Sequence, residues 1–143
     1  LIDMDNGQVR GMARPVNLKN ESIDVLRAFA PEAVLTPPVP DTLKGTVSLM
    51  RPPLASVQRR REPAMPAWIV LPRYIAGSPP RLVAHNRART SLLIAEQSFN
   101  YDIQGLRGFD ALCAVIDRCE CLQFTYGDLD DAVRAFDALA ATH

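Results

Sequence analysis

The clearest alternation of hydrophobic and polar positions lies in the second half of the chain. Apolar residues recur at three- and four-residue steps through 109–119 and again after Asp128, which predicts two helices. Asp128 itself has the position and the side chain of a helix N-cap. A further helix is expected over 87–98, and the every-second-residue pattern of 122–126 predicts a strand.

The first half has short patterns separated by long connections, and all twelve prolines fall between Pro15 and Pro80. Steps of three and four from Ile23 to Phe29 predict a helix that starts at Asn20 and stops before Pro31. Other expected elements are a hairpin turning at Asn6-Gly7, strands over 46–50 and 68–74, an extended loop over 37–40 and a polar loop over 55–67.

These patterns together predict a mixed α/β (α+β) fold with short strands and about four helices. No repeat and no low-complexity linker divides the chain, so we interpret residues 1–143 as a single domain. Hydrophobic residues make up 48% of the sequence and charged residues 22%, values typical of a globular protein. No apolar run approaches the length of a transmembrane helix, so no membrane association is expected.

The net charge is zero, but the charges are unevenly distributed along the chain. Residues 1–89 contain 13 Lys and Arg against 7 Asp and Glu, and residues 90–143 contain 3 against 9, which gives +6 and −6. Aromatic residues are only 6% and no recognition motif is visible, so a nucleic-acid partner is not expected. The three cysteines have no disulfide-framework spacing, which favours reduced thiols and a cytoplasmic location.

Three motifs that could carry chemistry are better explained by structure. The stretch "DMDNG" at 3–7 has the wrong glycine spacing for a calcium loop. Cys119-x-Cys121 would need two more zinc ligands, and only His85 and His143 are available, so we expect core or half-buried thiols and no metal site. His85 at a strand end is not expected to be a general base.

The most suggestive pattern is a set of three Arg/Pro junctions, Arg14-Pro15, Arg51-Pro52 and Pro72-Arg73, each near a strand edge. Proline stiffens the point at which the arginine leaves the sheet. With Lys19 just before a helix, three converging arginines would suit a ligand that carries phosphate. The alternative interpretation is that they are surface arginines with no shared target.

Two further groups have both a structural and a functional interpretation. Asn100, in the "SFNYD" stretch between two helices, could contact a ligand, while Phe99 and Tyr101 are expected to pack inward. Arg59, Arg60 and Arg61 form either a solvated loop or a site for an acidic or phosphorylated partner. No firm catalytic residue emerges, and no G-x-x-x-x-G-K-[ST] phosphate loop occurs in the sequence.

Five segments taken in order resemble the C-terminal part of HPr-kinase-related proteins, and the likeness is strongest to the bacterial group called HPr-kinase-related kinase A. They are "RPVNLKNESIDVLR" at 14–27, "KGTVSLMRPP" at 44–53, "PAWIVLPRY" at 66–74, "AEQSFNY" at 95–101 and "TYGDLDDAV" at 125–133. The resemblance implies the scaffold shared by HPr serine kinases and phosphoenolpyruvate carboxykinases. It also implies that the phosphate-loop half of the domain lies upstream of Leu1.

The parent protein that this resemblance implies is an ATP- and Mg²⁺-dependent kinase acting on a serine-type hydroxyl of a small protein or peptide. The 143-residue piece would then be inactive alone, would need no cofactor of its own, and would pair with the upstream half or self-associate through an open sheet edge. In this interpretation Lys19 is a point-charge phosphate contact, and Arg14, Arg51 and Arg73 are forked donors. The alternative is a non-catalytic partner-binding or assembly module derived from a kinase fold.

Overall fold

The computed structural model describes residues 1–142, and the chain divides into two units. The first consists of Leu1 and Arg10–Pro63, and the second of Ile2–Val9 and Ala64–His143. Two very short strands, β1 (Val9–Arg10) and β5 (Pro63–Ala64), each contain one residue from the first unit and one from the second. The interpretation of the chain as a single domain stays a prediction.

The first unit is built on a three-stranded antiparallel sheet with the order β2-β4-β3. Its elements are β2 (Val16–Lys19), α1 (Glu21–Phe29), β3 (Val39–Thr42), β4 (Gly45–Met50), the short helix α2 (Leu54–Gln58) and the 3-10 turn η1 (Arg59–Arg61). Leu18 and Ile23 are its buried apolar side chains, and the buried Ser48 hydroxyl donates to the Thr36 carbonyl oxygen at 2.8 Å.

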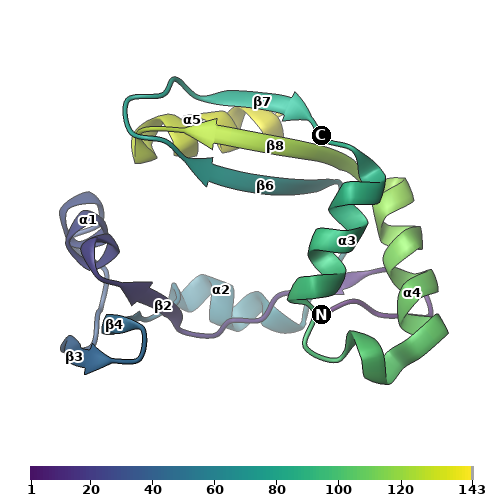
Figure 1. The fold of residues 1–143 in the computed structure, drawn as a ribbon, viewed down its shortest axis with the longest axis horizontal. Coiled ribbons are helices and arrows are strands. Elements are labelled where there is room, and N and C mark those ends of the chain that lie inside the picture. The colour runs from purple at the N-terminus through teal and green to yellow at the C-terminus, as the bar shows by residue number, and fades with distance from the viewer. Residues whose placement is uncertain (143) are drawn as a thin grey trace. The chain divides into compact units, whose positions relative to one another are not determined.

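The second unit has a mixed sheet with the order β6-β8-β7 and three helices (Figure 1). Its elements are β6 (Trp68–Tyr74), β7 (Arg81–Ala84), α3 (Arg87–Gln97), α4 (Tyr101–Arg118), β8 (Glu120–Tyr126) and α5 (Leu129–Ala140). Strand β6 runs parallel to the central β8, and β7 runs antiparallel to it. The helices α3 and α4 lie side by side and connect β7 to β8.

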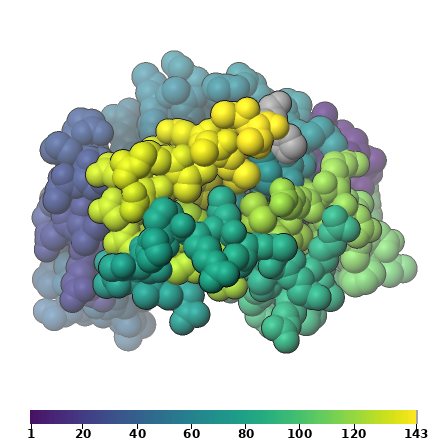
Figure 2. Space-filling model, turned by 90° about the horizontal axis from the view of Figure 1, so that it is seen from above, coloured from purple at the N-terminus to yellow at the C-terminus, as the bar shows by residue number. Residues whose placement is uncertain are grey.

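Two apolar clusters hold the helices of the second unit on its sheet. Leu112 and Ile116 of α4 pack with Cys121 of β8, against partly buried neighbours that include Ile69. The Phe124 ring, only 1% exposed, meets Phe136 of α5 edge-on with 5.3 Å between ring centroids. Figure 2 shows the other side of α5, in yellow-green, at the surface of the molecule.

The mixed α/β fold class predicted from the sequence is confirmed, and so are the strand 68–74, the start of the helix at residue 87 and the cap at Asp128. The Asp128 side chain accepts hydrogen bonds from the backbone N–H groups of Asp130 and Asp131. The predicted helix count was too low, because the described residues form five α-helices rather than about four. The extra helix is α2, whose five residues are too few to show a helical period.

Three local predictions were wrong or incomplete. The proline loop 37–40 runs into β3, where Pro40 is tolerated because β3 is an edge strand. The Phe99 side chain, expected to pack inward, is 96% exposed, whereas Tyr101 does pack against the cluster of Leu112, Ile116 and Cys121. Asn20 precedes α1 as predicted, but its side chain accepts from the Thr46 N–H at 3.0 Å and does not cap the helix.

Candidate anion-binding site

Four arginines line one pocket in the first unit. The lining comes from the segment 10–14 and from η1, and the pocket has a volume of about 360 Å³. The lining residues are Leu1, Arg10, Gly11, Met12, Ala13, Arg14, Arg60 and Arg61. We call this the arginine pocket; three of its arginines, Arg14, Arg60 and Arg61, were candidates from the sequence.

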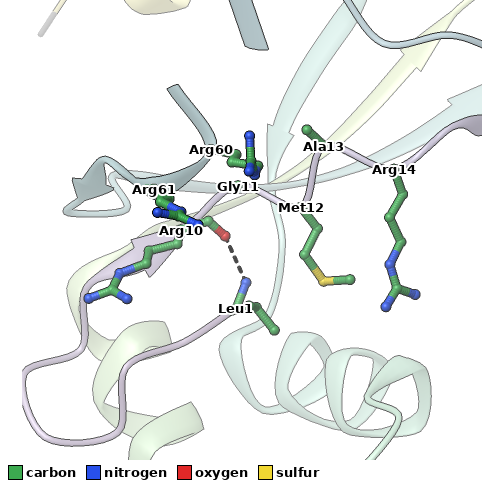
Figure 3. A pocket seen from close by; sticks show the side chains of 8 residues that line it. All are labelled: Leu1, Arg10, Gly11, Met12, Ala13, Arg14, Arg60 and Arg61. Carbon is green, nitrogen blue, oxygen red and sulfur yellow. Dashed lines mark hydrogen bonds between the residues drawn. The ribbon is translucent and has the colours of Figure 1, made fainter. Parts of the chain in front are cut away.

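The side chains of the arginine pocket fall into two groups (Figure 3). Arg10, Arg60 and Arg61 gather on one side, and Arg14 lies on the other side of Met12. Gly11 contributes only backbone to the wall between the groups. A bound ligand could therefore meet guanidinium groups at two places.

Short hydrogen bonds fix the backbone of this pocket. The Leu1 nitrogen donates to the Arg10 carbonyl oxygen at 2.8 Å, and the Arg10 N–H donates back to the Leu1 carbonyl oxygen at 2.8 Å. The Arg14 N–H donates to the Met12 carbonyl oxygen, also at 2.8 Å, which folds the segment tightly before β2. The Arg60 side chain is held by a hydrogen bond from Nη1 to the Val57 carbonyl oxygen at 3.0 Å.

The charge of the arginine pocket is not neutralised by the residues that the structure describes. None of the described lining residues is acidic, and none of the four arginines forms an ion pair within residues 1–142. Arg59 differs from its neighbours, because its Nε donates to the Glu62 carboxylate at 2.8 Å. That hydrogen bond and then the charge of Glu62 raise the pKa of Arg59, and Arg59 is not a lining residue.

Arg51 leaves the sheet at the same end at which Arg14 approaches it. The antiparallel register pairs Val16 with Met50, so the start of β2 and the end of β4 lie at one edge. Pro15 and Arg51 are the next residues beyond this pair, and the Arg51 N–H donates to the Val34 carbonyl oxygen at 2.9 Å. Two of the three Arg/Pro junctions therefore share one sheet end, although Arg51 is not among the lining residues of the pocket.

Lys19 lies at the opposite end of β2, where it pairs with Val47. It is three residue steps from Val16, about 10 Å along a strand. Its N–H donates to the Ser22 hydroxyl oxygen at 2.8 Å, and that hydroxyl donates to the Lys19 carbonyl oxygen at 2.7 Å. Lys19 is exposed and lies two residues before the start of α1, but the register separates it from the Arg14 end of the strand.

Arg73 and Asn100 belong to the second unit. Arg73 is an exposed residue of β6 paired with Thr125, and Asn100 is the exposed residue before α4, whose carbonyl oxygen accepts from the Gln104 N–H at 3.1 Å. The convergence of all three Arg/Pro junctions on one ligand stays a prediction.

The cysteines and histidines do not assemble a metal centre in the part of the chain that the structure describes. Cys119 and Cys121 are buried free thiols and Cys113 is half-buried, as the sequence predicted. Burial raises the pKa of the Cys119 thiol, the neighbouring Cys121 adds to the rise, and Arg118 opposes it. His143, considered as a second histidine ligand, lies outside the described residues.

His85 has a structural role. The buried Thr90 hydroxyl donates to the Asn86 carbonyl oxygen at 3.0 Å, and it lies 2.8 Å from His85 Nδ1. The Thr90 hydroxyl is therefore within hydrogen-bond distance of both the His85 ring and the Asn86 carbonyl oxygen. The pair fastens the end of β7 to the start of α3.

The sequence did not single out Arg10. Arg10 falls in the second strand of the predicted N-terminal hairpin. The one feature of the sequence that links it to the candidate site is its four-residue spacing from Arg14. That spacing has no defined meaning outside a helix, and the approach of residues 60 and 61 depends on tertiary structure. Arg10 was therefore not predicted as a candidate, whereas Arg14, Arg60 and Arg61 were.

No protein-family model, no curated protein and no solved structure matches this chain. None of the helices within residues 1–142 is both long and apolar enough to cross a lipid bilayer.

Proposed function

We propose that this chain is part of an ATP-dependent, HPr-kinase-related phosphotransferase and that it supplies basic side chains to the phosphate side of the reaction. One observation carries the proposal. Arg14 lies at the sheet end where Arg51 emerges, so two arginines from separate segments of the chain are found at one end of the sheet. Guanidinium forks at such a place stabilise the charge on a transferred phosphoryl group.

The proposed reaction is attack by a serine-type hydroxyl of a small protein or peptide on the γ-phosphorus of ATP. The bond to the bridging oxygen breaks, ADP leaves, and the hydroxyl proton passes to a base. ATP and Mg²⁺ belong to the parent protein in this proposal, because the 143 residues contain no phosphate-loop motif. Arg14 and Arg51 would act as positioning and charge-stabilising groups, with Lys19 and Arg73 as further candidates.

The test is phosphoryl transfer by the natural protein that contains this sequence. We expect transfer from γ-labelled ATP to a protein or peptide hydroxyl in the presence of Mg²⁺. Arg14→Ala and Arg51→Ala should each lower kcat/KM by about 10²-fold without lowering Tm. Arg89→Ala, which removes an exposed arginine of α3, is the matched control.

Absence of ATP-dependent transfer, or full activity in both Arg14→Ala and Arg51→Ala, would contradict the proposal. A loss of Tm parallel to the loss of activity would reassign these arginines to a structural role. Arg14→Lys keeps the charge and removes the fork, so partial activity in that variant supports a forked contact.

A second candidate function, a non-catalytic partner-binding module, is favoured by Arg60 and Arg61. Both line the arginine pocket, and the described lining contains no group that reacts covalently. Nucleotide binding by the natural protein distinguishes the phosphotransferase from the partner-binding module. The module would bind an acidic partner and would show no Mg²⁺-dependent affinity for ATP.

A further inference from the structure

The arginine pocket concentrates more positive charge than a single phosphate group can balance. Four guanidinium groups line it and no described lining residue is acidic. We propose that it binds a ligand that carries at least two linked phosphate groups and no bound metal ion. Arg14 is shared with the reaction proposed above, whereas Arg10, Arg60 and Arg61 have no part in it, and the inference does not depend on that reaction.

Charge sets the number of phosphate groups. Each phosphate contributes roughly −1.5 to −2 near neutral pH. Two or more linked groups carry more negative charge than one and therefore come closer to balancing the +4 of Arg10, Arg14, Arg60 and Arg61. A single phosphate leaves about half of the guanidinium charge uncompensated within one pocket.

Geometry supports an extended ligand. The volume of about 360 Å³ lies at the small end of the range for small-molecule sites. The arginine side chains lie on two sides of Met12, with Arg10, Arg60 and Arg61 on one side and Arg14 on the other (Figure 3). A ligand that contacts arginines on both sides of Met12 has to be extended, and a single tetrahedral anion is not.

The lining also predicts that the ligand binds without Mg²⁺. Mg²⁺ in proteins is held through carboxylates and waters together with substrate phosphates, and the described lining offers no carboxylate. A chelated cation neutralises part of the phosphate charge and adds a positive charge beside four arginines. Mg²⁺ bound to the phosphates of the ligand should therefore weaken binding at this pocket. An Mg–ATP site requires the opposite.

Part of the pocket is held in place by backbone groups. The Arg60 guanidinium is fixed by the Val57 carbonyl oxygen, and residues 10–14 are fixed by the paired bonds between Leu1 and Arg10 and by the Arg14–Met12 turn. Because these groups are already held in place, ligand binding costs less conformational entropy, which favours affinity.

The experiment is calorimetric titration of the 143-residue chain with inorganic tripolyphosphate, with divalent ions chelated, at about 0.15 M salt to screen diffuse attraction. Arg10→Ala and Arg61→Ala remove pocket charges outside the machinery proposed for phosphoryl transfer. Each should weaken binding about tenfold, the effect of losing one charge-assisted contact. Arg89→Ala removes the same charge from α3 and should leave the affinity unchanged. Orthophosphate should bind more weakly than tripolyphosphate, and saturating Mg²⁺ should weaken tripolyphosphate binding.

Three results would overturn the inference: equal weakening by Arg89→Ala and Arg61→Ala, tighter binding of the Mg²⁺ complex, or orthophosphate binding as tightly as tripolyphosphate. Circular dichroism of each variant verifies that it is folded, and Arg61→Lys, which retains the charge, should recover part of the affinity. Failure of the kinase assay leaves these outcomes unchanged, so the two proposals fail separately.

Discussion

Replacing Gly45 by alanine should destabilise the first unit through two separable effects. Gly45 has φ +81°, a backbone conformation that costs a non-glycine residue about 1–2 kcal/mol. An added Cβ would also lie close against Asn20 Oδ1, the atom that accepts from the Thr46 N–H at 3.0 Å. Displacing that oxygen removes the hydrogen bond, about 0.5–1.5 kcal/mol more. The expected total is about 1.5–3.5 kcal/mol.

A double-mutant cycle separates the two effects. Asn20→Gly deletes the obstructing side chain and suits the positive φ of residue 20, which is 49°. Gly45→Ala in the Asn20→Gly background should then cost only the backbone part, about 1–2 kcal/mol. The difference between the two backgrounds should be about 0.5–1.5 kcal/mol, the coupling expected for residues in direct contact.

The assay needs a probe in the first unit, because Trp68 and the three tyrosines all belong to the second. Amide hydrogen exchange of β2 and β4, followed residue by residue by NMR, reports the free energy of opening where the change is made. Equal cost of Gly45→Ala in both backgrounds, or a cost below about 0.5 kcal/mol in the unaltered background, would refute the reasoning.

The remaining predictions concern the second unit. Gly127→Ala should cost about 2–4 kcal/mol by urea denaturation, because its Cβ would lie 2.7 Å from the Ile75 carbonyl oxygen and backbone must move; a cost below that of an ordinary surface change contradicts this. Asp128→Ala should cost about 1 kcal/mol through loss of the α5 cap, while Asp128→Asn should recover most of it. Cys113 should react with iodoacetamide before Cys119, since Cys119 is fully buried and its pKa is raised. Because that pKa is higher in the folded than in the unfolded chain, folding stability should fall as pH rises above the ordinary thiol value, and Cys119→Ala should reduce this slope.

The local patterns of the sequence predicted several elements of the second unit, although the helix expected over 109–119 begins at Tyr101 and the Phe99 side chain is exposed. Ile69 of β6 packs against Leu112 and Ile116, whose four-residue spacing places both on one face of α4. Asp128 caps α5 through backbone groups two and three residues away. Each of these interactions is either short in range or repeated with a fixed period, so a single sequence records it.

The first unit depended more on contacts between distant residues. Asn20 has a capping side chain and the right position, yet its Oδ1 bonds to Thr46, 26 residues away. The short helix α2 has too few residues for a period, and Pro40 lies in a strand because β3 is at the sheet edge. These outcomes depend on which strands pair and in what register, and no local pattern specifies either.

The same distinction applies to the candidate site. The sequence by itself identified Arg14, Arg51, Arg60 and Arg61 as unusual, because their proline neighbours and their clustering are visible along the chain. Only the tertiary structure decided that residues 10–14 and 60–61 line one pocket and that Arg51 shares the Arg14 end of the sheet. Composition records which charges are present, whereas antiparallel pairing and the fold of the connecting segments determine which of them meet.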